Sequence, residues 1–182
     1  MNAWGHFKTI TSHKFLVMKY CFKVGLYKQG FLHDLSKYSP TEFFVGCRYY
    51  QGTRSPNNAE RESTGYSKAW LHHKGRNRHH FEYWIDYGQE PGSAMQGMKM
   101  PVKYVVEMLC DRVAACKTYY KENYNDSMPF EYFNKNRKHY MMHPETMELL
   151  GKMLIMLKRY GEEDTLVYLS LIHISEPTRL RC

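Results

Sequence analysis

The recurrence of apolar residues at helical spacing constrains the fold of this chain more than any other feature of its sequence. In the clearest case, a predicted helix over residues 11–27 carries one stripe at i, i+3, i+4, i+7 and i+11, formed by His13, Leu16, Val17, Tyr20 and Val24. No segment shows a convincing alternation of apolar and polar residues with the period of two that marks a strand. The sequence therefore predicts an all-α protein, a single-domain helical bundle.

Start and stop signals divide the rest of the chain into further helices. Ser39 to Glu42 has the pattern of a capping box, with Pro40 at the first helical position, which predicts a helix over residues 40–50 and a structural role for Glu42. The remaining helices are predicted over residues 66–87, 101–120, 129–139 and 144–160, the last ended by Gly161, with surface loops over residues 51–65 and 88–100.

Composition limits the kinds of partner. The formal net charge is +8, from 26 Lys and Arg against 18 Asp and Glu, which favours phosphorylated metabolites, nucleic acid or an acidic surface without choosing among them. The five cysteines form no CxxC pair, as is typical of reduced cytosolic thiols. The N-terminus lacks the apolar core of a signal peptide, and the most apolar stretch, residues 147–157, is too short to span a bilayer. We therefore expect a cytoplasmic protein without a membrane segment.

The end of the chain differs in character from the rest. Residues 169–179, LSLIHISEPTR, resemble the in-frame translation of a transposon-end adapter used in sequencing libraries. The resemblance implies that residues 1–168 are the native domain, truncated at its C-terminus, and that residues 169–182 are a non-native tail. Residues of this tail, such as His173, are accordingly left out of the candidate site.

Histidine and aspartate residues recur at positions that a helical bundle could bring together. Metal sites need several neutral imidazoles and ionised carboxylates, contributed by separate elements. The candidate ligands are His13 on the inward stripe, the adjacent pair His33 and Asp34, then His73, His79 and His80, and finally Asp111, with His72 as an alternative to His73. Glu107, one helical turn before Asp111, is a possible further carboxylate. The sequence thus predicts a His/Asp metal centre.

Each of these residues taken alone has an ordinary structural explanation. An inward histidine such as His13 is more often a hydrogen-bonded core residue, a histidine doublet is usually a solvated helix face, and Asp111 could pair with Arg112. If the helix over residues 66–87 is continuous, however, His73, Asn77 and His80 share one face at i, i+4 and i+7. Asn77 would then orient a ligand or contact substrate. The joint pattern favours the metal centre.

The order of these residues resembles the HD superfamily of metal-dependent phosphohydrolases. The resemblance is carried by His13, by His33 and Asp34 within FLHDLSKYS, and by Asp111 within EMLCDRVAA, and it covers roughly residues 11–120. It implies a helical domain of the HD type in which these four residues hold a metal ion. A lysine three residues after the HD pair often helps to hold a phosphate in that family, which implies the same role for Lys37.

The additional histidines resemble the variants of that superfamily that hold two metals. His73 (or His72) corresponds to their single histidine, and His79 with His80 to their His-His doublet, although those variants separate the two by far more chain. The Gly-Tyr-Pro signature of cyclic-dinucleotide enzymes does not follow the doublet. The segments SPTEFF and AWLHHKGRNRHHFEYW look closest to an uncharacterised bacterial and phage-associated branch.

These observations predict a hydrolase that cleaves a phosphate ester, of a nucleotide or a related phosphorylated metabolite, with one or two divalent ions (Mn, Fe, Zn, Mg or Co). Such an ion would polarise the phosphoryl oxygen and lower the pKa of bound water. Lys37, with help from Arg76 or Arg78, would offset charge on the phosphate, and Asn77 would contact substrate. Glu107 or a neighbouring histidine would act as general base.

Two other classes of function fit the same pattern. Histidine-rich ligation also suits a di-iron oxidoreductase. A non-enzymatic module could instead use the basic surface to bind nucleic acid or a protein, with a steep salt dependence. An HNH-type nuclease fits poorly, because that motif spreads its residues over a hairpin and a helix at longer spacing. The substrate, the metal and the oligomeric state stay open at this point.

Overall fold

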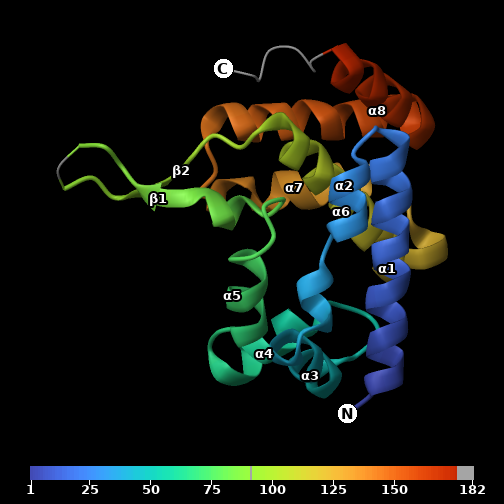
Figure 1. The fold of residues 1–182 in the computed structure, drawn as a ribbon, viewed down its shortest axis with the longest axis vertical. Helices are drawn as coiled ribbons and strands as arrows, with labels where there is room; N and C mark the ends of the chain where they lie inside the picture. Colours follow the sequence, from blue (N-terminus) through green and yellow to red (C-terminus); the bar gives the residue numbers. More distant parts are fainter. Residues whose placement is uncertain (91, 176–182) are drawn as a thin grey trace.

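Two long helices, α1 (Ala3–Lys23) and α6 (Val102–Tyr120), pack against each other, with α1 along one edge of the molecule in Figure 1. The computed structural model describes residues 1–90 and 92–175, and of residues 172–175 the backbone only. Val17 and Val105 are fully buried in the core to which both helices contribute. The first helix begins earlier than the predicted residue 11, because the Asn2 side chain accepts a hydrogen bond from the Gly5 N–H and caps it.

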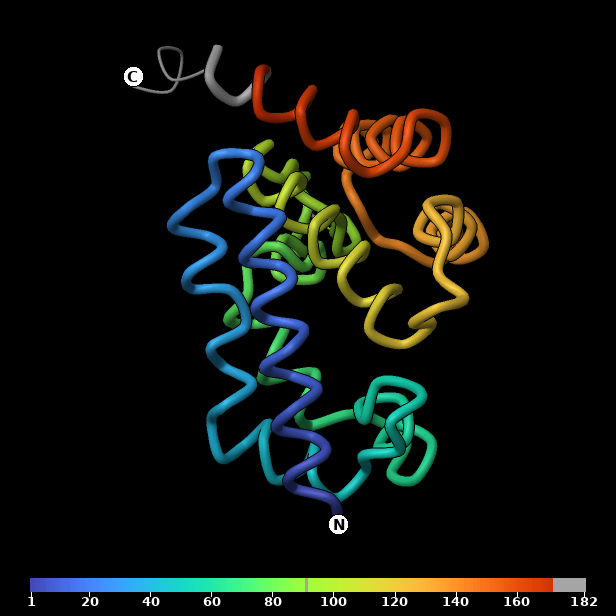
Figure 2. The backbone as a smooth tube through the Cα atoms, turned by 90° about the vertical axis from the view of Figure 1, so that its right-hand side faces the viewer, coloured from blue at the N-terminus to red at the C-terminus, as the bar shows by residue number. Residues whose placement is uncertain are grey.

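Shorter elements follow α1. They are α2 (Tyr27–Leu32), the 3-10 turn η1 (Leu35–Tyr38), α3 (Pro40–Tyr49), α4 (Pro56–Thr64) and α5 (Lys68–Lys74). The chain turns back along α1 through α2, and α3, α4 and α5 then lie near the N-terminal end of α1 (Figures 1 and 2). The prediction of a loop over residues 51–65 is wrong in its second part, where α4 forms. This helix has proline at its first turn and ends at Gly65, whose φ of 83° is left-handed. Only Ala59 and Glu60 of this helix are buried, so its sequence is polar and lacks the apolar periodicity that would have predicted a helix.

The predicted helix over residues 66–87 is also wrong, because α5 ends at Lys74 and Gly75 caps it. The chain then turns into the 3-10 segment η2 (Phe81–Trp84) and a hairpin of β1 (Ile85–Tyr87) and β2 (Met95–Gly97), antiparallel with Ile85 opposite Gly97. Figure 1 shows this hairpin projecting from the helices. In the described residues the sheet consists of these two short strands, and the other elements are helices. The all-α architecture predicted from the sequence is therefore confirmed.

The C-terminal part covers the other side of α6. It comprises the 3-10 turn η3 (Lys121–Asn123), α7 (Met128–Asn136), the 3-10 turn η4 (Arg137–His139) and α8 (Pro144–Ser175). Gly161 interrupts α8 with φ 81° and ψ 174°, which confirms the predicted end of a helix there. Among the described residues, none of the helices combines the length and the apolarity that crossing a membrane requires.

The segment interpreted as a non-native tail lies partly within the structure. α8 continues through its first residues, and Leu169 is buried in the core. Residues 176–182 lie outside the described part of the chain, so the interpretation of residues 169–182 as non-native stays a prediction.

The contact between α1 and α3 leaves no room for a side chain at Gly46. A Cβ at this position would lie 2.1 Å from Nε2 of His6, and this ring is itself held between Phe43 and Tyr50. We expect Gly46→Ala to lower the free energy of unfolding by about 1–3 kcal/mol, the usual cost of overpacking, as measured by urea denaturation.

A matched control for this prediction is Gly75→Ala. The new Cβ would meet nothing closer than the Leu71 carbonyl oxygen, at 3.5 Å, and the backbone conformation there suits any residue. We expect this variant to stay within about 0.5 kcal/mol of wild type. Equal stabilities of the two variants would contradict the close contact at Gly46.

Candidate metal centre

The pair His33 and Asp34 lies in the tight turn between α2 and η1. Asp34 adopts a left-handed conformation, with φ 54° and ψ 24°, which Asp and Asn tolerate better than most residues with a Cβ. Both residues are only 2% exposed. The turn therefore directs an imidazole and a carboxylate into the interior, against α1 and α6, and strained backbone of this kind is concentrated at functional sites.

Four predicted ligands form a first set. His13 on α1 and Asp111 on α6 approach to 3.0 Å between Nε2 and Oδ1, and Nε2 of His33 lies 3.6 Å from the same oxygen. Oδ2 of Asp34 lies 3.3 Å from Nε2 of His33 and 3.9 Å from Nε2 of His13. The four ligand atoms all lie within 4.8 Å of one another. Three distant segments thus converge on one position that could hold a metal ion.

A second set lies beside the first and shares Asp34 with it. The other carboxylate oxygen, Oδ1, lies 3.2 Å from Nε2 of His73 and 3.4 Å from Nε2 of His79. His80 completes the set, with its Nε2 2.9 Å from Nε2 of His73. One carboxylate therefore presents its two oxygens to two groups of imidazoles, and each of the two sets could hold a metal ion.

The structure distinguishes between the neighbouring histidines of α5. Nδ1 of His72 lies 2.6 Å from Oε1 of Glu42, and His72 belongs to neither set, whereas His73 does. The predicted common helix face of His73, Asn77 and His80 does not exist, because α5 ends before Asn77. A turn in which the His80 N–H donates to the Asn77 carbonyl brings the doublet back towards His73 instead.

Two buried glutamates lie behind the imidazoles. Oε1 of Glu107 lies 3.0 Å from Nδ1 of His33 and 3.1 Å from Nδ1 of His79, so it contacts one histidine of each set. Oε2 of Glu42 lies 2.8 Å from Nδ1 of His73. A carboxylate that accepts the Nδ1–H of a histidine leaves the lone pair of Nε2 free for a metal and raises the basicity of the ring.

These contacts revise the roles expected for the two glutamates. Glu42 does not close a capping box, because the Ser39 side chain makes no capping hydrogen bond and the Glu42 carboxylate faces His72 and His73. Glu107 was a candidate general base, but its carboxylate faces the rear of His33 and His79, and it is not among the residues that line the adjoining cavity. Glu42 is thus placed to position His73, whereas Glu107 also forms a third group of possible metal ligands with His33 and His79.

The electrostatics of the centre favour ionised carboxylates. Burial alone would raise the pKa of Asp34, but the charges of His33 and Lys37 hold it well below its ordinary value. Burial likewise opposes ionisation of Asp111, and hydrogen bonds from His13 and His33 hold the pKa of its carboxyl well below the usual range. Both side chains are therefore anionic at neutral pH, the form in which a carboxylate binds a metal.

Burial and the surrounding charges shift the pKa values of two of these histidines in opposite directions. Burial would lower the pKa of His33, but the adjacent Asp34 and the nearby Asp111 raise it well above its ordinary value. Burial, with the neighbouring His79 and His73, holds the pKa of His80 well below it. His80 is thus neutral, the form in which an imidazole binds a metal. The negative charge that favours a proton on His33 comes from Asp34 and Asp111, and a divalent cation bound there would neutralise the same charge.

The ligand atoms themselves are the strongest sign that a cation belongs here. Within the described residues, Nε2 of His33, Nε2 of His79 and both carboxylate oxygens of Asp34 are buried without a hydrogen-bond partner. Lys37 offsets part of this as an ion pair of 2.6 Å with Oδ2 of Asp34, and the surrounding imidazoles approach the same carboxylate to 3.2–3.4 Å. Buried polar atoms without partners are costly, and a mixed set of imidazoles and carboxylates suits ions such as Mn, Fe or Zn. The residues present fit a pair of divalent ions.

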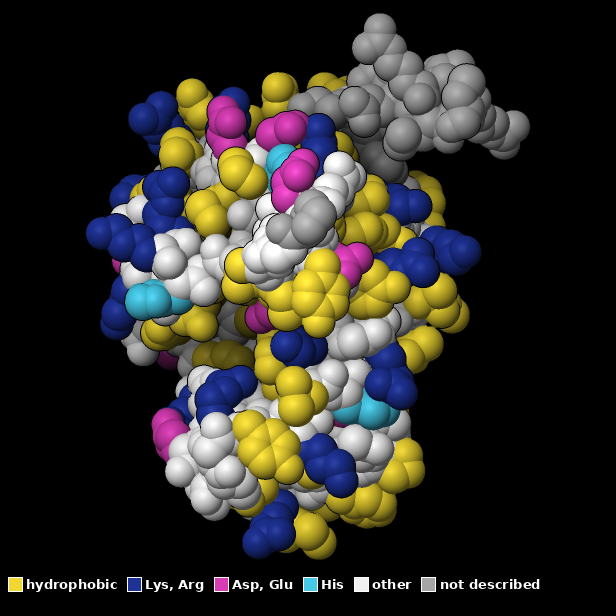
Figure 3. Space-filling view, turned by 90° about the vertical axis from the view of Figure 1, so that its left-hand side faces the viewer, with side chains coloured by type: hydrophobic (Ala, Val, Ile, Leu, Met, Phe, Trp, Pro, Cys, Tyr) yellow, Lys and Arg dark blue, Asp and Glu magenta, His cyan; other side chains and the backbone are white. Residues whose placement is uncertain are grey.

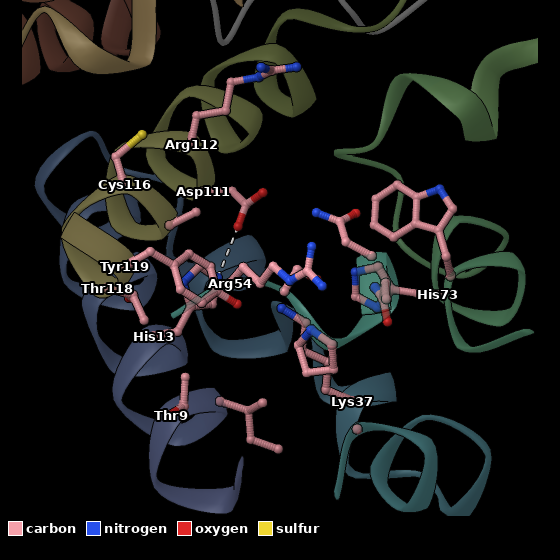
Figure 4. A pocket seen from close by; sticks show the side chains of 18 of the residues that line it. Thr9, His13, Lys37, Arg54, His73, Asp111, Arg112, Cys116, Thr118 and Tyr119 are labelled. Carbon is pink, nitrogen blue, oxygen red and sulfur yellow. Dashed lines mark hydrogen bonds and ion pairs between the residues drawn. The ribbon is translucent and has the colours of Figure 1, made fainter. Parts of the chain in front are cut away.

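A cavity of about 570 Å³ opens onto this centre (Figure 4). The ligands His13, His73, His80 and Asp111 form part of its wall, beside aromatic side chains such as Trp70. Figure 3 shows one face of the molecule hollowed at mid-height, with Lys and Arg side chains above and below. The volume is that of a site for a small molecule.

Of the residues predicted to bind substrate, only one lines the cavity, and this residue is Lys37. Asn77 is buried and donates from Nδ2 to the Ser36 hydroxyl and to the His73 carbonyl, both at 2.8 Å, so it positions a ligand. Arg76 and Arg78 are exposed and do not line the cavity. Their guanidinium groups instead lie 3.3 Å from the His72 carbonyl and from the Tyr104 hydroxyl, respectively.

Three other arginines line the cavity and were not singled out from the sequence as substrate-binding residues: Arg54, Arg61 and Arg112. Arg54 and Arg61 belong to the region predicted as a loop, where no pattern marked them. For Arg112 a signal existed, since it directly follows Asp111. A side chain next to a metal ligand on a helix can reach the wall of the same cavity.

Comparison with known proteins adds one match. The model of a protein family described as "Family of unknown function (DUF5662)" matches residues 2–156, a range that contains both ligand sets. No curated protein and no solved structure matches the chain.

Proposed function

Because the chain belongs to DUF5662, a family of unknown function, we propose its function from the centre itself: a dinuclear metal-dependent phosphohydrolase of the HD type. Its substrate would be a small phosphate ester, a nucleotide or a related metabolite. The observation that carries the proposal is the position of Asp34, whose two oxygens face separate ligand sets beside a basic cavity. The convergence of His13, His33 and Asp111 on this residue supports the relationship to the HD superfamily.

Bound divalent ions would supply Lewis acidity at the phosphoryl group and lower the pKa of a water molecule. The side chains of the chain hold and orient the other participants. Lys37 stays protonated, because the charges of Asp34 and Asp111 outweigh burial and raise its pKa. From the cavity wall its ammonium group can offset negative charge on a phosphate.

The lining of the cavity supports an anionic and small substrate. Lys37, Arg54, Arg61 and Arg112 all contribute to the wall, in a chain of net charge +8. Positive charge around a concave site attracts anions and raises their local concentration. A cavity of about 570 Å³ holds a metabolite rather than a folded nucleic acid. Phosphorylated metabolites satisfy both conditions.

The test is release of phosphate by the purified protein supplied with Mn²⁺, across nucleoside phosphates and p-nitrophenyl phosphate. We expect activity that EDTA removes and Mn²⁺ restores, and a kcat lowered by about 10²-fold or more in Asp111→Asn, since loss of a mere partner of a ligand commonly costs 10- to 100-fold. Arg78→Gln, outside the cavity, is the control and should keep wild-type activity. A metal-loaded protein that cleaves none of these esters would count against a phosphohydrolase.

The shared carboxylate also favours a second candidate, a di-iron oxidoreductase. Histidine-rich sites with a carboxylate between two ion positions suit iron as well as manganese or zinc. Protein purified without oxygen would then contain iron and develop visible absorption on exposure to air. Colourless protein that lacks iron and hydrolyses phosphate esters decides for the first candidate.

A further inference from the structure

Arg112 differs from the other basic residues of the cavity in having no polar partner. Lys37 is paired with Asp34, Arg54 forms two ion contacts with Glu62, and Arg61 donates to the side chain of Asn58. For Arg112 no hydrogen bond or ion pair occurs within the part of the chain that the structure describes, and its Nε is buried without a partner. Glu82 also lines the cavity, and the charge of Arg112 opposes the rise of the Glu82 pKa on burial, but no ion pair joins the two side chains in the described structure. A partly buried guanidinium without a close ion pair or hydrogen-bond acceptor is costly.

Aromatic packing holds this guanidinium in place. Its central carbon lies 5.4 Å from the ring centre of Tyr140 and 5.9 Å from that of Phe133. Such cation–π contacts fix the orientation of the planar group but supply no hydrogen-bond acceptor for its five N–H donors. The side chain is therefore positioned in advance at the wall of the cavity, where a ligand could reach its terminal N–H groups.

The position of Arg112 relative to the metal centre suggests which ligand. Arg112 follows Asp111 on α6, and both line the cavity. Figure 4 shows Arg112 at one end of this space and Lys37 towards the other, with Asp111 between them. A phosphoryl group at the ligand sets would thus have a cation on each side, only one of which already has a carboxylate partner.

We propose that Arg112 binds a second phosphoryl group, so that the substrates of this enzyme carry at least two. The inference rests on the proposed phosphohydrolase function and narrows its substrate class to di- or polyphosphorylated compounds. A planar guanidinium binds phosphate oxygens through two parallel hydrogen bonds, which a phosphate monoester held at the metal centre would leave unused. The scissile group would lie at the metal ligands and the second group at Arg112.

The test compares the binding of inorganic tripolyphosphate and orthophosphate by calorimetry, with Mn²⁺-loaded protein whose metal content is verified after each titration. We expect wild type to bind tripolyphosphate at least about tenfold more tightly than orthophosphate. Arg112→Gln should lose about tenfold in affinity for tripolyphosphate and change that for orthophosphate by no more than about twofold. Arg112→Met, which retains an apolar stem against Phe133 and Tyr140, should behave in the same way if the glutamine variant folds poorly.

Arg78→Gln is the matched control, because it removes the same charge from an exposed arginine outside the cavity. Unchanged tripolyphosphate affinity in both Arg112 variants overturns the proposal, and so does an equal loss in Arg78→Gln. Binding separates this inference from the proposed function. If the protein prefers tripolyphosphate through Arg112 but hydrolyses no ester, the Arg112 subsite is supported and the phosphohydrolase function is contradicted. If it hydrolyses monoesters without this preference, the phosphohydrolase function is supported and the subsite is contradicted.

Discussion

Asp34→Asn is expected to release both metal ions and abolish phosphate release. Asp34 is the one residue whose carboxylate belongs to both ligand sets, through Oδ2 towards His33 and Oδ1 towards His73. The asparagine side chain has no charge, and each ion would lose an anionic ligand. Asparagine also tolerates the left-handed backbone at this position, where φ is 54°, so the variant isolates the loss of charge from any backbone strain.

Elemental analysis after dialysis measures this effect. We expect about two ions per chain in wild type and well under one in Asp34→Asn, as for loss of a shared ligand. Asp111→Asn is the informative comparison, because Asp111 belongs to the first set only. It should retain about one ion, held by Asp34, His73, His79 and His80. Two ions retained in Asp34→Asn would contradict the shared carboxylate.

Glu107→Gln is expected to weaken the binding of both ions by about 10- to 100-fold, although Glu107 belongs to neither of the two sets that share Asp34. The carboxylate lies 3.0 Å from Nδ1 of His33 and 3.1 Å from Nδ1 of His79, one histidine from each set. Glutamine keeps the shape of the side chain but removes the negative charge that makes these imidazoles stronger donors. Competition with a chromogenic chelator measures the two affinities.

Glu42→Gln provides a matched control for this prediction. Glu42 is also a buried glutamate behind the ligands, but among them it contacts His73 alone, which belongs to the second set. We expect only one of the two affinities to fall, again by about 10- to 100-fold. If Glu107→Gln and Glu42→Gln weakened the same single ion, Glu107 would not support both sets.

Much of the candidate site follows from local patterns in the sequence. His13 lies on an apolar stripe at helical spacing, and this spacing places it on the buried side of α1. The HD pair and the resemblance to HD enzymes indicated His33, Asp34 and Asp111, and the structure brings these residues within reach of His13. Such inferences succeed because helical periodicity depends on neighbours three and four residues apart.

The residues between α5 and the hairpin show where sequence patterns fail. A regular helix over residues 66–87 would place His73, Asn77 and His80 on one face, yet the chain turns at Gly75 and still brings His80 to His73. The same turn carries Arg76 and Arg78 away from the cavity. Whether a helix continues past a glycine depends on tertiary packing that outweighs local propensity, and a local sequence pattern does not reveal that packing.

Some charged residues around the centre were indicated by the sequence, and others were placed there only by the tertiary structure. The resemblance to HD enzymes implied that Lys37, three residues after Asp34, helps to hold a phosphate, and the structure places Lys37 against Asp34 and on the cavity wall. The sequence offered no means of placing Arg54 at the cavity, and it assigned Glu42 to a helix cap. These contacts join segments more than 20 residues apart, such as Glu42 with His72, and arise only when α3, α4 and α5 pack together.

The sequence by itself determined a helical protein with inward His and Asp side chains, because periodicity and stop signals such as Gly161 act over one or two turns of chain. Only the tertiary structure decided that Asp34 belongs to two ligand sets and that Glu107 contacts a histidine of each. It also decided that Arg112 lines the cavity, where the described residues offer its side chain no ion pair. The reason is physical. A ligand set depends on ångström-scale distances between atoms of α1, α5 and α6, and those distances are set by how the buried side chains of the whole domain pack.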